Sequence, residues 1–362
     1  VRVAVGLVAT GLLRLGAEVG ARVALMGRNS ELYFEYMFAV TAIGALVVPL
    51  NIRSGGDELS HMLLDSHSTF LVADEGLLPQ GVRASVQTYA HTYVKLPDHL
   101  AKPLPGRPGA RLSAPASSAA IALIDHSELT SRAELPTEQW GQGGPKAYGL
   151  FYTSGTTGSA KGVVLSHGNQ LFQASCKVAT IGLDRQTVYL AALPLFHVGG
   201  ISIALGVAMA KGSLVIDPDL QWASAWELIE ARSVNLLTVV PAVLQLLYDA
   251  SDAHPAAAVA AAAAAPRIRG LLVGGQSLSA AQLERAKRTF DGAAIVQTYA
   301  CTEACSSITF KHVADPRAAL ANARAAGTAA RVAASAVGPA SVATSAGAAA
   351  GGAAGTAAGA AA

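Results

Sequence analysis

Residues 153–162, TSGTTGSAKG, combine the residue types that bind phosphate. Glycines let the backbone approach a ligand closely, and the amides and hydroxyls can donate hydrogen bonds to phosphate oxygens. Lys161 adds a positive charge. The spacing is not that of a Walker A loop, which has glycine before the lysine and serine or threonine after it. We therefore expect a phosphate-binding loop of another kind, made of Thr153, Ser154, Gly155, Thr156, Thr157, Gly158 and Lys161.

The neighbours of this loop favour phosphate binding over an ordinary polar turn. The apolar run YGLFY (148–152) precedes it and is typical of a buried strand. Ser166 follows it and is a plausible N-cap for a helix. A loop between a strand and a helix is a common setting for phosphate sites.

Three later segments carry candidate functional residues: PLFHVGG (194–200), LLVGGQSLS (271–279) and YACTEACSS (299–307). Taken singly, each has an ordinary explanation, because a lone histidine is more often a core residue and a Thr-Glu pair can begin a helix. Together with YTSGTTGSAKGVVLSHGN (152–169), however, they resemble the ordered motifs of the adenylate-forming superfamily. That superfamily includes acyl-CoA ligases, luciferases and the adenylation domains of peptide synthetases. Ala160 and Ala300 stand where it usually has proline and glycine.

The resemblance implies roles for individual residues. Tyr299 would stack on adenine, Thr302 would contact the α-phosphate and Glu303 would hold Mg²⁺. Gly274 and Gly275 would flank the adenine and acyl pocket. The implied substrate-binding residues are His197, Gly199, Gly274 and Cys301, and the implied catalytic residues are Lys161, Thr302 and Glu303.

The implied reaction uses ATP, Mg²⁺ and CoA and has two steps. A carboxylate attacks the α-phosphorus of ATP and releases pyrophosphate, and the thiol of CoA then displaces AMP to give a thioester. Cys301 and Cys305 are read as packing residues, because CoA supplies the sulfur. The first step brings two anions together, so positive charge matters more than a general base.

Within the superfamily, residues 29–53 and 302–316 resemble the 2-succinylbenzoate–CoA ligase family, particularly its plant type. That resemblance implies activation of o-succinylbenzoate for phylloquinone or menaquinone synthesis, in a chloroplast or peroxisome if the plant type holds and otherwise in the cytoplasm. A ligase for another acid, such as a fatty acid or a 4-coumarate type, remains an alternative. So does a non-catalytic nucleotide-binding remnant.

Strand and helix patterns alternate along the chain and predict an α/β fold with mostly parallel, helix-covered sheets. By the resemblance, this is the large N-terminal domain of adenylate-forming enzymes. Helices are expected at 1–16, 32–45, 56–66 and from Ser166. Strands are expected at 22–26, 46–50, 70–74, 150–153, 187–192, 213–216, 236–240, 269–273 and 294–299. Residues 96–144 are rich in Pro, Ala, Ser and Gly and read as a long, divergent surface connection.

The predicted domain covers 1–317, followed by a tail at 318–362 that we expect to be disordered, where 24 of 45 residues are alanine. The tail contains no aspartate and no lysine. The superfamily uses an aspartate to contact the ribose and a lysine of its C-terminal domain in adenylation. We therefore expect the small C-terminal domain to be missing, and this chain to bind nucleotide weakly and to have lost most adenylation activity.

The overall composition narrows the classes of partner. Lys and Arg number 26 against 24 Asp and Glu, a net charge of +2, which gives no reason to expect nucleic acid. Three cysteines are too few for a disulfide framework. Residues 186–210 lack charged side chains, but a proline and two adjacent glycines near their centre favour a buried strand, a loop and a buried helix over a membrane span. The expected partners are small molecules, and the oligomeric state is not indicated.

Overall fold

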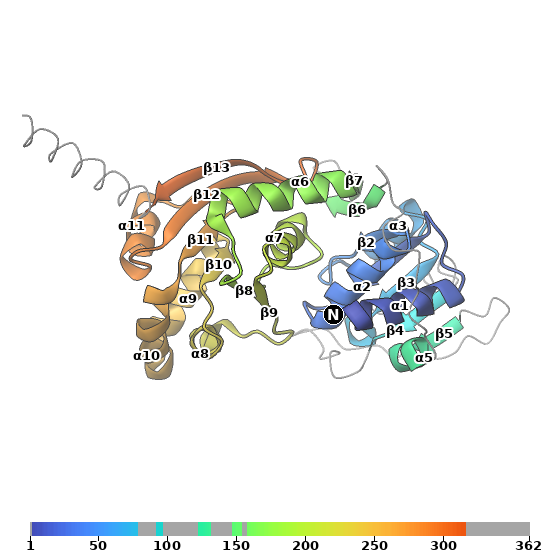
Figure 1. Ribbon diagram of the computed structural model, residues 1–362, viewed down its shortest axis with the longest axis horizontal. Coiled ribbons are helices and arrows are strands. Elements are labelled where there is room, and N and C mark those ends of the chain that lie inside the picture. The colour runs from blue at the N-terminus through green and yellow to red at the C-terminus, as the bar shows by residue number, and fades with distance from the viewer. Residues whose placement is uncertain (1, 79–91, 97–121, 132–146, 154–157, 316–362) are drawn as a thin grey trace, which may run out of the picture. The chain divides into compact units, whose positions relative to one another are not determined.

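The computed structural model describes residues 2–78, 92–96, 122–131, 147–153 and 158–315 (Figure 1). These residues belong to one compact unit that spans Val1–Pro316. Two sheets are built in succession along the chain, each covered by helices on both faces. The α/β fold with parallel-dominated sheets is therefore confirmed.

The first sheet has seven strands within the described residues, in the order β5-β4-β3-β1-β2-β6-β7. Neighbouring strands are parallel except for the antiparallel pair β6–β7. The strands are β1 Arg22–Met26, β2 Leu46–Pro49, β3 Phe70–Ala73, β4 Thr92–Lys95, β5 Ala122–Asp125, β6 Ala147–Thr153 and β7 Lys161–Ser166.

Alternation along β1 explains how both faces of this sheet are covered. Val23 and Leu25 enter one core with helices α1 (Arg2–Arg14) and α2 (Glu31–Ala42). Ala24 and Met26 enter another core with α3 (Gly56–Asp65). Successive side chains of a strand point to opposite faces, so a fully apolar strand needs helices on both sides. The short helix α5 (His126–Ser131) follows β5.

The second sheet has six strands within the described residues, in the order β13-β12-β11-β10-β8-β9, and only β12–β13 is antiparallel. The strands are β8 Val188–Leu190, β9 Ser213–Val215, β10 Leu236–Val239, β11 Gly270–Val273, β12 Ala294–Cys301 and β13 Ser306–Ala314. The helices are α6 His167–Lys177, α7 Val198–Met209, α8 Ala225–Ala231, α9 Pro241–Ala253, α10 Pro255–Ala264 and α11 Ala280–Thr289. Short turns of 3-10 helix cover Glu75–Leu77, Trp222–Ser224 and Ala265–Arg267, and a π-helical turn covers Val178–Gly182.

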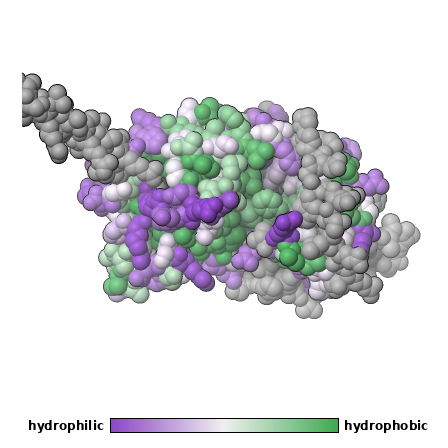
Figure 2. All heavy atoms as spheres, viewed as in Figure 1, coloured by the Kyte–Doolittle hydropathy of each residue, from purple (hydrophilic) through white to green (hydrophobic). Residues whose placement is uncertain are grey.

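Helix α6 has an unusual distribution of side chains. Its buried residues are Gln170, Gln173, Ala174 and Lys177, whereas Leu171 and Phe172 are exposed. Figure 2 shows apolar side chains at the surface in this region. An amphipathic helix normally buries its apolar residues, so the burial of polar side chains on α6 needs an explanation.

Most of the predicted elements are confirmed, including the helix that Ser166 caps through a capping box with Asn169. Residues 186–210 form β8, a loop and α7, as predicted. Among the described residues, no helix combines the length and apolar character needed to cross a membrane. Two predictions were wrong. Residues 96–144 contain β5 and α5, and Lys161 begins strand β7 rather than lying in a loop. The predicted tail, 318–362, lies outside the described residues.

Candidate active site

Strands β6 and β7 form an antiparallel hairpin that carries the predicted phosphate loop. Thr153, the last residue of β6, pairs with Lys161, which is exposed at the first position of β7. Gly162 obscured this strand in the sequence, because glycine is uncommon inside strands. Gly158 has φ +120°, a conformation that favours glycine. Ser154, Gly155, Thr156 and Thr157 lie outside the described residues.

Helix α3 holds both ends of this hairpin loop. The imidazole Nε2 of His61 donates to the carbonyl of Ala160 at 2.9 Å, which requires a proton on that nitrogen. The hydroxyl of Tyr152 donates to Asp65 Oδ2 at 2.8 Å and to the carbonyl of Met62 at 3.2 Å. Burial, together with the bond to Asp65, raises the pKa of Tyr152, so it remains a donor at neutral pH. The loop therefore starts and ends at fixed points.

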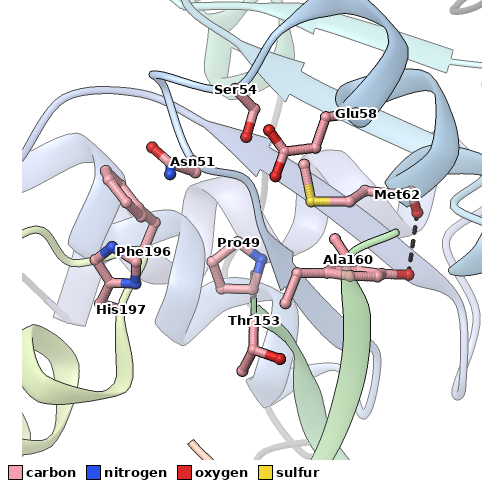
Figure 3. A pocket seen from close by; sticks show the side chains of 10 residues that line it. Pro49, Asn51, Ser54, Glu58, Met62, Thr153, Ala160, Phe196 and His197 are labelled. Carbon is pink, nitrogen blue, oxygen red and sulfur yellow. Dashed lines mark hydrogen bonds between the residues drawn. The ribbon is translucent and has the colours of Figure 1, made fainter. Parts of the chain in front are cut away.

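A cavity of about 90 Å³ adjoins these points. Figure 3 shows His197 and Glu58 on opposite sides of it, with Pro49 between them. The lining residues are Pro49, Asn51, Ser54, Glu58, Met62, Tyr152, Thr153, Ala160, Phe196 and His197. The structure thus brings Thr153 and His197, from two separate predicted motifs, to one pocket. Asn51, Ser54 and Glu58 were missed, although polar residues after the carboxyl end of a parallel strand are a signal for ligand contact.

His197 is the N-cap residue of α7, and its side chain makes no capping bond. The ring is open to solvent through the pocket and lies against Phe196, with centroids 4.6 Å apart. Desolvation by the surrounding protein, and then the positive charge of Arg53, lower the pKa of His197. Its imidazole is therefore neutral at pH 7 and can donate one hydrogen bond and accept another. Gly199 follows it in the first turn of the helix.

The carboxyl ends of three strands of the second sheet bring the predicted glycines close to the predicted tyrosine. A Cβ on Gly274 would lie 3.2 Å from Thr298 Cγ2, and Gly275 has φ +79° with a Cβ position 3.1 Å from Val240 Cγ1. A side chain at either position would crowd the turn after β11 against Thr298 or Val240, and the positive φ of Gly275 favours glycine there. Tyr299, next to Thr298, is 67% exposed. An aromatic ring presented at this edge is suited to stacking on a planar ligand.

The turn between β12 and β13 carries the remaining predicted residues. Cys301 and Thr302 are half-buried, and Glu303 is exposed. Among the described residues no group of three or more His, Cys, Asp or Glu side chains could hold a metal ion. A lone carboxylate such as Glu303 could hold Mg²⁺ only together with ligand or water oxygens, as is usual for this ion at phosphate sites. Cys305 is buried, and desolvation raises the pKa of its thiol to about 11. That value disfavours the thiolate that a nucleophile requires.

One hydrophobic core connects these segments. Cys305, Phe151 of β6 and Leu195 of the segment before α7 all belong to it. The β12–β13 turn, the β6–β7 hairpin and the PLFHVGG segment therefore share one core. The pocket and the hairpin loop could bind an anionic group, and the exposed ring could bind a planar one.

The chain is similar to known proteins over most of its length. The AMP-binding enzyme family matches residues 1–338. The 2-succinylbenzoate–CoA ligase, chloroplastic/peroxisomal, of Arabidopsis thaliana is 30% identical over 316 residues, which are 85% of this chain and 52% of that protein. A feruloyl-CoA synthase of an Amycolatopsis species is also 30% identical, over 83% of this chain and 53% of that protein. The chain thus spans about half the length of these curated relatives.

Solved structures of similar fold include the O-succinylbenzoate coenzyme A synthetase of Bacillus subtilis in complex with AMP. It is 25% identical, with a TM-score of 0.64, and the match covers 85% of this chain and 68% of that chain.

Proposed function

The chain belongs to the AMP-binding enzyme family, and from this premise we propose that it forms the nucleotide- and acid-binding body of an AMP-forming acid–CoA ligase. The observation that carries the proposal is the shared pocket, where Thr153 of the phosphate-loop hairpin meets His197 of the acyl-site motif. A ligase of this kind must bring the acid carboxylate next to the α-phosphate. A pocket lined from both motifs supports that requirement.

The residues around the pocket would neutralise negative charge rather than transfer protons. The acid is already ionised at neutral pH, with a pKa of about 4. Lys161 and the hairpin-loop amides would neutralise the phosphates, and Thr302 would contact the α-phosphate. Glu303 would hold Mg²⁺, which stabilises developing negative charge when bound. Neutral His197 would contact the acid without adding a charge that competes with Lys161.

The adenine would lie at the carboxyl edge of the second sheet. Tyr299 supplies an exposed ring there, and the glycine turn after β11 lies at the same edge of the sheet, against Thr298. Stacking of a base on an aromatic side chain contributes roughly 1–3 kcal/mol. Tyr299 would therefore provide much of the affinity for the base and little for the phosphates.

For the acid we propose an aromatic carboxylate, with o-succinylbenzoate as the leading candidate. Curated relatives at 30% identity include a 2-succinylbenzoate–CoA ligase and a feruloyl-CoA synthase, both named for aromatic acids. The resemblance of residues 29–53 and 302–316 favours the first. With the plant type, the compartment would be a chloroplast or peroxisome.

Nucleotide binding by the purified chain tests the proposal. We expect calorimetry to detect ATP binding in the presence of Mg²⁺, and Tyr299→Ala to weaken that binding about 5- to 150-fold. Phe172→Ala is the matched control, because Phe172 is also 67% exposed but lies on α6. Equal losses in both variants, or no binding by the unaltered chain, would refute the assignment of this edge.

The acid and the reaction need separate measurements. Thermal shifts with o-succinylbenzoate, ferulate and a long-chain fatty acid, each with AMP present, should rank the aromatic acids first. Pyrophosphate exchange should be slow, because this chain spans only half of its relatives' length. Binding without any exchange would favour a nucleotide-binding remnant. Exchange as fast as in a full-length relative would show that these residues suffice.

A further inference from the structure

Two buried polar side chains of α6 lie directly beneath the β12–β13 turn. Lys177 is 1% exposed, and its Nζ donates to Gln173 Oε1 and to Ser306 Oγ, both at 3.3 Å. Gln173 Nε2 donates to the carbonyl of Ala304 at 3.0 Å and to that of Ser307 at 2.8 Å. We propose that Gln173 and Lys177 are positioning residues that hold the turn so that Thr302 and Glu303 reach the nucleotide and its metal. This inference rests on the proposed function.

The lysine determines which way the glutamine amide points. An ammonium can only donate hydrogen bonds, so it must face the oxygen of Gln173. Both hydrogens of Nε2 are then directed at the two turn carbonyls. If the amide were flipped, its NH₂ group would face Lys177 and its oxygen would face two carbonyls. Lys177 thus acts on the turn through Gln173 as well as through Ser306.

The two glutamine bonds fall on either side of a strained stretch of backbone. Cys305 has φ +60° and Ser306 has φ +125°, values that residues other than glycine rarely adopt. The Cys305 N–H donates to the carbonyl of Thr302 at 2.8 Å and closes the turn. Such a conformation persists only where surrounding contacts enforce it. Gln173 bonds to the carbonyls of Ala304 and Ser307, which flank Cys305 and Ser306.

Burial of the ammonium argues that the pair has more than a packing role. An isolated buried charge is strongly disfavoured, and apolar residues of similar size are often as stable or more so. No carboxylate bonds to Lys177 in the described structure. A role in maintaining the conformation of the turn that carries Glu303 would explain why a lysine is buried beneath it.

Hydrogen exchange of the nucleotide-free chain tests the contact itself. Lys177→Met and Gln173→Met keep an unbranched side chain of similar length and remove the polar groups. Amide exchange in 302–307 should speed up at least tenfold in either variant. Gln170→Met is the matched control, because Gln170 is buried one turn earlier on the same helix and its amide has no partner in the described part of the chain. Unchanged exchange in both variants would overturn the inference.

Ligand binding tests the consequence. Both variants should weaken Mg²⁺–ATP binding about tenfold and leave adenosine binding unchanged, because the turn serves the phosphates and metal. A purely structural role would instead lower both affinities together, in proportion to lost stability, and would overturn the inference. If one variant does not fold, the other decides. If the unaltered chain binds neither ligand, the proposed function fails, and the positioning role fails with it. If it binds both and the variants bind equally well, only the positioning role fails.

Discussion

The side chain of Asn29 is bonded to the backbone of Leu195, 166 residues further along the chain. Asn29 Oδ1 accepts from the Leu195 N–H at 2.8 Å, and its Nδ2 donates to the carbonyls of Ala191 and Leu193, each at 2.8 Å. Asn29 follows β1 of the first sheet, and the segment it binds follows β8 of the second. One side chain thus satisfies three backbone groups of the segment that leads to His197.

Replacing Asn29 with alanine should therefore destabilise the chain and the pocket together. A typical net hydrogen bond contributes about 1 kcal/mol, and buried groups left unpaired add to the loss, so we expect roughly 2–4 kcal/mol. Urea denaturation measures the free energy of unfolding. Gln245→Ala, which removes an exposed hydrogen bond to Asp249, is the control and should change it by less than about 0.5 kcal/mol. Equal effects of the two substitutions would contradict this prediction.

Two adjacent glycines in the PLFHVGG segment should respond differently to alanine. A Cβ on Gly200 would lie 2.1 Å from the backbone oxygen of Pro194, whereas one on Gly199 would meet Leu193 Cδ1 only at 4.0 Å. Gly200→Ala must push α7 away from the preceding loop and should cost roughly 2 kcal/mol or more.

Gly199→Ala is the internal control for this prediction. It lies in the first turn of α7, where alanine should be neutral or stabilising by up to about 1 kcal/mol. Thermal denaturation of the two variants checks the difference. A Gly200→Ala protein as stable as Gly199→Ala would show that the loop adjusts freely.

The core strands could be predicted from sequence because short, continuous apolar runs are typical of buried strands. RVALM and GLLV are short, β-branched or aliphatic, and bounded by polar or glycine residues, and they form β1 and β11. Strand β13 was missed because SSITFKHVA has no apolar run and is largely exposed. It forms because it pairs antiparallel with β12, and the periodicity of its own sequence gives no sign of that pairing.

The candidate site was only partly predictable for a similar reason. Motif residues such as Thr153, His197 and Tyr299 carry recognisable chemistry in their local sequence. Glu58 and Gln173 do not, because a polar residue on a helix ordinarily faces solvent. Their roles come from contacts with residues about 100 or more positions away. Such contacts require the packed fold, which a local pattern cannot specify.

The buried ammonium of Lys177 should make stability depend on pH. Desolvation lowers its pKa from 10.5 to about 8. Between these values the unfolded chain binds more protons than the folded one, so the free energy of unfolding should rise with pH. Cys305 opposes this above about pH 9, because burial raises its pKa from 9.0 to about 11. Cys176, on the same helix, is the other titratable neighbour, and its charge favours the ammonium.

The clearest window is therefore pH 8–9. Over this window we expect the free energy of unfolding of the unaltered chain to increase by about 1 kcal/mol, because one proton changes stability by at most about 1.4 kcal/mol per pH unit. Lys177→Met should abolish this increase. Urea denaturation at intervals across this window measures the difference between variant and unaltered chain. Lys211→Met, at an exposed position, should give a parallel profile. Parallel profiles for Lys177→Met would show that the ammonium is not desolvated.

Lys161 should distinguish ligands by their number of phosphates. It is exposed at the start of β7, paired with Thr153 at the opposite end of the loop. Lys161→Gln should weaken ATP binding roughly 5- to 50-fold, AMP binding less and adenosine binding not at all, because only phosphate charge is affected. Since exposed charges are screened, the loss should shrink as salt rises towards 1 M. Calorimetric titrations at low and high salt, with Lys211→Gln as the control, measure it. Similar losses for adenosine and ATP would mean that Lys161 acts through folding, because a lost charge cannot discriminate against a ligand that has none.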